Sequence, residues 1–138
     1  MKTITDIVPR WVRIVVALFA FANITFGISG YVDPSALFQN YSTGIDLTGL
    51  AAKYASYEFA ARNLAVGLAL MIAALKGVPE SITIVTIIRV FIELQTMIVA
   101  VLTNNVGVTV VVPAVFLALK LLIVKTMVGV IQQRDALT

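Results

Sequence analysis

The 138-residue sequence contains no cysteine and no histidine. Their absence excludes disulfides, thiol redox chemistry and zinc sites built on thiolate or imidazole ligands. It also excludes a histidine general base and the usual histidine or cysteine ligands of haem. No nucleotide-binding loop, EF-hand loop, HExxH or GxSxG motif is present. We therefore expect neither a bound metal nor a cofactor.

Charged residues are also scarce, at 12% of the chain, which is about half their usual share in soluble domains. Hydrophobic residues make up 60%, against roughly 45–50% in soluble domains. A soluble fold of this length could not bury so much apolar surface, whereas a bilayer accommodates it. The net charge of +3 is small and the basic residues are scattered, so nucleic-acid binding is not expected. The composition predicts an integral membrane protein in contact with the lipid bilayer.

Four apolar segments are each long enough to cross a hydrocarbon core of ~30 Å as a helix. They cover residues 11–30, 56–75, 82–102 and 108–127. Tight turns at 76–81 and 103–107 join the last three segments, which makes neighbouring helices antiparallel. The longer connection between the first two segments mixes turn formers with apolar residues, which indicates short helices at the membrane interface. We predict a single all-α domain over residues 1–138, a four-transmembrane-helix antiparallel bundle.

Basic residues near the segment ends predict the orientation. One side of the membrane receives Lys2, Arg10, Arg13, Lys76, Lys125 and Arg134. Only Lys53 falls on the other side, so the positive-inside rule places both termini in the cytoplasm. A signal peptide is the alternative for the first segment, because residues 20–22 (Ala-Phe-Ala) imitate a cleavage site. The apolar run continues past that site, which favours a membrane-spanning helix.

Two apolar segments carry charges, as pairs spaced i,i+4: Glu58 with Arg62, and Arg89 with Glu93. Such spacing places both members of a pair on one helix face. Charges at membrane depth are costly and usually face a protein interior or a wet cavity. Folding the chain about the 76–81 turn brings Arg62 and Glu93 to nearly the same depth, which predicts an ion pair between them.

The candidate site is a set of polar residues at comparable depths. It comprises Asn23, Glu58, Arg62, Asn63, Arg89, Glu93 and Lys120. Folding about the 103–107 turn places Lys120 opposite Val90, one residue from Arg89. In the first interpretation these residues are structural, with a buried ion pair that fixes the helix register. In the second they form the floor of a pocket, where Arg62 or Arg89 binds an anionic or carbonyl group.

The charge balance favours one kind of ligand. Three cations against two carboxylates leave one excess positive charge, which suits an anionic or oxygen-rich molecule. The leading hypothesis is a non-catalytic membrane protein that binds a lipophilic or anionic small molecule, or serves as an accessory subunit of a membrane complex. The alternative is a small homodimeric transporter with Glu58 or Glu93 as its coupling carboxylate. A lipid-modifying enzyme is disfavoured, because an arginine and a carboxylate alone define no reaction class.

Local motifs suggest a family. Residues 57–68 (YEFAARNLAVGL) follow a loop that contains VDP at 32–34 and GIDL at 44–47, and the third segment then carries Arg89 and Glu93. This order resembles the DoxX-like group of small four-helix membrane proteins. In that group an arginine followed shortly by a glycine in the second helix, and an arginine with an acidic residue in the third, recur.

The resemblance implies a four-helix bundle in a bacterial-type inner membrane, with Arg62, Arg89 and Glu93 in its polar core. Some relatives are linked to quinone-coupled sulfur oxidation, which makes a lipid or a quinone the implied kind of ligand. The cysteines that the thiol-handling relatives use are missing here. The sulfur chemistry is therefore not carried over to this chain.

Overall fold

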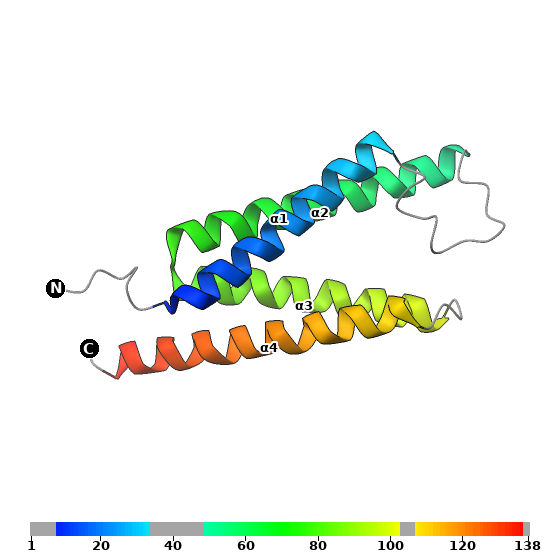
Figure 1. The fold of residues 1–138 in the computed structure, drawn as a ribbon. Coiled ribbons are helices and arrows are strands. Elements are labelled where there is room, and N and C mark those ends of the chain that lie inside the picture. The colour runs from blue at the N-terminus through cyan, green and yellow to red at the C-terminus, as the bar shows by residue number, and fades with distance from the viewer. Residues whose placement is uncertain (1–7, 34–48, 103–106, 137–138) are drawn as a thin grey trace. The chain divides into compact units, whose positions relative to one another are not determined.

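The computed structural model describes residues 8–33, 49–102 and 107–136. These residues form four α-helices and no strand. The helices are α1 (Arg10–Val32), α2 (Leu50–Lys76), α3 (Pro79–Leu102) and α4 (Val108–Asp135), in the order drawn in Figure 1. All four are long and apolar enough to cross a membrane. The predicted all-α, four-helix class is confirmed, and the protein is an integral membrane protein in contact with the lipid bilayer.

Two helices extend beyond the predicted spans. Helix α2 begins at Leu50 rather than at residue 56, because residues 50–55 are good helix formers with no glycine or proline among them. Helix α4 continues to Asp135 instead of ending at residue 127. Gly129 does not stop it, since a single glycine weakens a helix without breaking it. The predicted interfacial helices between α1 and α2 fall on residues outside the described ranges.

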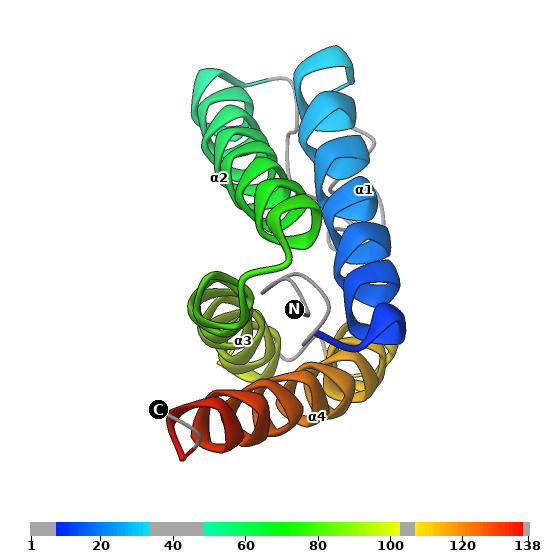
Figure 2. The ribbon, with the colours of Figure 1, turned by 90° about the vertical axis from the view of Figure 1, so that its left-hand side faces the viewer.

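The chain divides into two compact units, and the first is Val16–Ile72. It contains most of α1 and α2, which lie side by side in Figure 2. Their antiparallel contact is close because glycines remove side chains from it. A Cβ built on Gly27 would lie 2.9 Å from the backbone nitrogen of Leu64, and one on Gly67 would lie 2.9 Å from that of Ile24. The backbones of α1 and α2 therefore approach each other at two successive levels.

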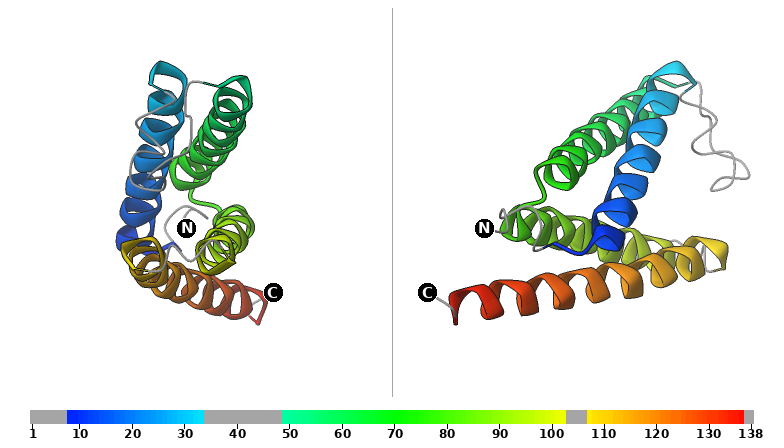
Figure 3. Two further views of the ribbon diagram at one scale, coloured as in Figure 1. Left: turned by 90° about the vertical axis from the view of Figure 1, so that its right-hand side faces the viewer. Right: turned by 60° about the vertical axis from the view of Figure 1, so that its left-hand side comes forward.

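The second unit is built from α3 and α4, together with the chain before residue 16 and the end of α2. Helices α3 and α4 run antiparallel and side by side (Figure 3). Ion pairs join them at two levels, Glu93 with Lys120 and Glu80 with Arg134. Neighbouring helices are thus antiparallel within each unit, as the sequence predicted.

Candidate functional site

Glu93 of α3 and Lys120 of α4 lie on the helix faces that contact each other. On α3 the spacing of Thr86, Val90 and Glu93 repeats every three or four residues, and all three are buried. On α4, Lys120 and Ile123 are buried at the same spacing. Helical periodicity therefore turns Glu93 and Lys120 toward the interior of the α3–α4 pair instead of toward lipid.

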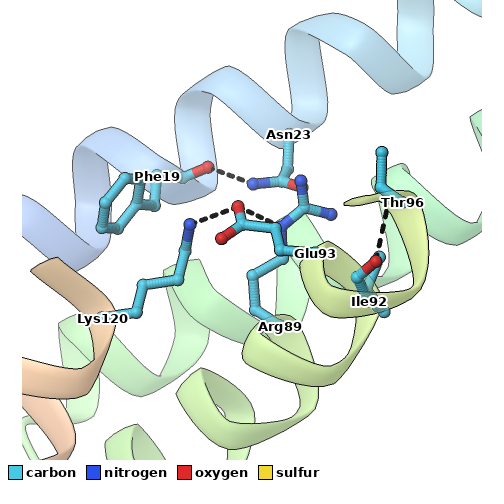
Figure 4. Close-up of polar contacts among 7 residues, drawn as sticks. All are labelled: Phe19, Asn23, Arg89, Ile92, Glu93, Thr96 and Lys120. Atoms are coloured by element: carbon cyan, nitrogen blue, oxygen red, sulfur yellow. Dashed lines mark hydrogen bonds and ion pairs between the residues drawn. The ribbon is translucent and has the colours of Figure 1, made fainter. Parts of the chain in front are cut away.

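One carboxylate oxygen contacts both cations of this cluster (Figure 4). Lys120 Nζ donates a hydrogen bond to Glu93 Oε1 at 2.5 Å, and the two side chains are 2% and 7% exposed. Arg89 Nε lies 3.6 Å from the same oxygen, with its side chain 17% exposed. Two positive charges thus face one negative charge. We call Arg89, Glu93 and Lys120 the charge cluster.

The charge cluster lies far from both ends of its helices. At ~1.5 Å per residue, Glu93 is ~21 Å from Pro79 and ~14 Å from Leu102 along α3. Lys120 is ~18 Å from the start of α4 on the same scale. A hydrocarbon core of ~30 Å therefore encloses the cluster wherever α3 is placed across it.

Two oxygens beside the cluster retain hydrogen-bonding capacity. Glu93 Oε2 and Thr86 Oγ1 are buried and have no hydrogen-bond partner among the described residues. Lys120 Nζ also lies 5.4 Å from the centre of the Phe116 ring, a cation–π contact one helical turn away. A buried acceptor without a donor is costly. Each of these two oxygens can therefore accept a further hydrogen bond, and the net charge of the cluster suits one further anion.

Two amides of the predicted site, Asn23 and Asn63, belong to the α1–α2 unit. Both are buried at 4% exposure. Asn23 Nδ2 donates to the carbonyl oxygen of Phe19 at 2.6 Å, and Asn63 Nδ2 donates to that of Phe59 at 2.9 Å (Figure 4 draws the former). Each amide thus returns a hydrogen bond to its own helix, as polar side chains in apolar surroundings commonly do.

Glu58 and Arg62 differ from the other predicted site residues, because both are exposed on α2. Within the described part of the α1–α2 unit, neither forms an ion pair. The structure gives Glu93 the partners Lys120 and Arg89, and the Arg62–Glu93 pair, which would join the two units, stays a prediction. In the register of α3 against α4, Lys120 pairs with Glu93, three residues beyond the expected Val90.

Sequence reasoning missed a structural role of Arg13. Its Nε and Nη2 donate to the carbonyl oxygens of Ala74 and Leu75 at 3.0 and 3.1 Å. These carbonyls belong to the last turn of α2, where helical partners are lacking. Gly77 follows with a φ of 64°, and its N–H bonds the carbonyl of Ala73. One signal in the sequence could have indicated this contact. Gly77, which ends α2, and Arg13, near the start of α1, fall on the same side of the membrane in the predicted topology.

Within the described ranges, no group of three or more acidic side chains could hold a metal ion. Comparisons with protein-family models, curated proteins and solved structures found no match. The likeness to the DoxX-like group stays a prediction, and the function is inferred from the geometry of the charge cluster.

Proposed function

We propose that this membrane protein binds a lipophilic small molecule through an anionic or carbonyl oxygen at the charge cluster. The observation that carries the proposal is two cations around one carboxylate at mid-helix depth. In a medium of low dielectric constant a cluster with a net charge is costly. An anionic group, or an oxygen that accepts hydrogen bonds, would offset the excess positive charge. The planar guanidinium of Arg89 is well suited to bind it, because it offers several donors in a fixed geometry.

A purely structural role is the competing explanation. A register-fixing ion pair needs one cation for Glu93, and Lys120 supplies it at 2.5 Å. Arg89 adds a second cation that such a pair does not require, with part of its side chain exposed. The role of Arg89 therefore separates the two explanations.

The test compares small molecules that co-purify with the wild-type protein and with Arg89→Gln. This substitution removes the excess charge and leaves the Glu93–Lys120 pair in place. Native mass spectrometry, with organic extraction of the same samples, should detect a bound molecule on the wild-type protein. The occupancy on Arg89→Gln should be about tenfold lower, because a hydrogen bond to a charged group contributes ~1.5–3 kcal/mol. Lys125→Gln is the matched control, since Lys125 is an exposed cation on α4. Equal occupancy on wild-type protein and Arg89→Gln, or no bound molecule on either, would contradict the proposal.

We further infer a bacterial inner-membrane location with both termini in the cytoplasm, and a lipid or quinone as the class of ligand. The charge bias supports the orientation, because Arg10 and Arg13 at the start of α1 lie at the same end as Lys76, the last residue of α2. The sequence likeness to the DoxX-like group supports the location and the ligand class.

A proton-coupled homodimeric transporter is the weaker proposal. Glu93 is held by two cations, and four helices of one chain hardly enclose a transport pathway. A role as an accessory subunit is compatible with the same cluster, and a protein partner in the native mass spectrum would reveal it. An enzymatic function has the least support, because the cluster contains no identifiable nucleophile with its base.

A further inference from the structure

The face of α2 that carries Glu58 and Arg62 points away from α1. Helix α2 contacts α1 through Ala60 and Gly67, both of which are buried. On a helical projection at 100° per residue, Glu58 and Arg62 lie nearly opposite to that buried face. Both are exposed, and they are one helical turn apart on the same side of the helix. We call this surface the charged face of α2.

The charged face lies at membrane depth. At ~1.5 Å per residue, Arg62 is ~21 Å from Lys76 and Glu58 is ~27 Å from it along α2. A hydrocarbon core of ~30 Å that begins near Lys76 therefore includes both side chains in its outer part. Ionised side chains are costly against lipid and are usually directed toward protein. The charged face is therefore poorly suited to acyl chains.

We propose that the charged face of α2 is the contact surface for a second copy of this chain. Two copies inserted in the same orientation can meet about a two-fold axis along the membrane normal, which makes their α2 helices parallel. Glu58 of each copy is then ~6 Å in height from Arg62 of the other, a separation that these long side chains bridge. One glutamate and one arginine per copy thus form two reciprocal ion pairs, and the surface is complementary to itself, as a two-fold interface requires.

Neighbouring residues on this face support close contact of the two helices. Ala55 and Ala65 are exposed on either side of the two charges. Small side chains allow transmembrane backbones to approach, and a close approach strengthens polar contacts across helices. Charge complementarity identifies the partner as a second copy, because a surface that carries one positive and one negative charge at a fixed spacing is complementary to itself. The proposal is independent of ligand binding at the charge cluster.

A charge exchange tests the proposal directly. Glu58→Arg alone gives the face two positive charges, and Arg62→Glu alone gives it two negative charges, so each variant should dimerise poorly with itself. Co-expressed, the two variants should pair with each other, because every cation then faces a carboxylate. The double exchange Glu58→Arg/Arg62→Glu should also dimerise. An ion pair between Glu58 and Arg62 of the same chain would not restore dimer formation between the two co-expressed variants. Mixed dimers therefore distinguish pairing between copies from pairing within one chain.

The measurement uses the absence of cysteine in the chain. Ala65→Cys introduces one thiol beside the charges, and copper-phenanthroline oxidation in native membranes then reports contact between copies. We expect efficient disulfide-linked dimers in the otherwise unchanged chain and about a tenfold lower yield for either single charge variant, in the range of polar interhelical contacts in membranes. Different tags on the two single variants identify the mixed dimer. Leu18→Cys, a 63% exposed position on α1, is the control and should show background yield.

A further variant controls for misfolding of the like-charged chains. Glu58→Gln/Arg62→Gln carries no net charge change and inserts more easily, yet it lacks the ion pairs, so its cross-linked yield should also fall. Three results would overturn the proposal. They are a background yield for Ala65→Cys alone, an unchanged yield in both single charge variants, and the absence of mixed dimers on co-expression.

Discussion

The α1–α2 and α3–α4 pairs associate through different kinds of contact. Both consist of long apolar helices in antiparallel contact. Between Val16 and Ile72, the α1–α2 pair has an uncharged contact face, with glycines where the backbones approach and amides bonded to their own helix. The α3–α4 pair instead buries Glu93 and Lys120 at its centre, with Arg89 half-buried beside them. The same bilayer thus permits association by close backbone contact or by charge.

The difference matters because the two kinds of contact have different energetics. Helices in lipid gain little from burying apolar side chains, so close van der Waals packing and interhelical polar contacts drive their association. Close packing tolerates no added volume but contains no charge that could be left unpaired. A buried ion pair tolerates small shifts, yet losing one partner leaves the other charge in a medium of low dielectric constant. A pair held by charge is therefore the more sensitive to single substitutions, and the more suitable for a ligand.

The largest effect is expected from Lys120→Met. The substitution keeps the length of the side chain and removes its charge, so Glu93 loses the hydrogen bond at 2.5 Å and retains Arg89 at 3.6 Å. Breaking a buried pair in this way costs ~3–5 kcal/mol. Reversible unfolding in mixed micelles, with the free energy extrapolated to zero denaturing detergent, measures the loss. Lys125→Met, on the exposed side of α4, should leave the free energy nearly unchanged.

The triple substitution Arg89→Gln/Glu93→Gln/Lys120→Met sharpens this result. It removes all three charges of the cluster, so no charge is left without its partner, and most of the stability should return. If the triple variant is as unstable as Lys120→Met, the loss arises from packing at position 120 and not from an unpaired charge.

A smaller loss is expected from Gly67→Ala in the other helix pair. The added Cβ would lie 2.9 Å from the backbone nitrogen of Ile24 and 3.0 Å from the carbonyl oxygen of Ala20, so α1 and α2 must separate. Overpacking of this kind costs ~1–3 kcal/mol. Gly129→Ala is the matched control, because nothing lies within 4 Å of its Cβ position on α4. There the better helix propensity of alanine should give a slight gain in the same unfolding measurement, and a loss at Gly129 equal to that at Gly67 would refute the packing argument.

The sequence predicted the helices better than the contacts between them. Long apolar segments and the glycine–proline turn identify α3 within a few residues, because lipid leaves a hydrophobic chain few alternatives to a helix. The pairing of Glu93 with Lys120 was missed, since folding about a turn gives depth but not rotation or register. A shift of three residues is enough to exchange Val90 for Glu93 opposite Lys120. The side-chain capping by Arg13 was missed for the same reason, because it depends on contacts between α1 and the end of α2.

The two ion pairs of α3 and α4 differ in depth, and Arg134→Gln tests whether depth sets their importance. Arg134 Nη1 lies 2.6 Å from Glu80 Oε1, but the two side chains are 34% and 39% exposed at the end of the helices. Water and salt screen such a pair, so its contribution to stability is small. We expect no measurable change in unfolding free energy, with any residual difference lost as ionic strength rises. A loss comparable to that of Lys120→Met would mean that the helix ends, and not the buried charge cluster, hold this pair together.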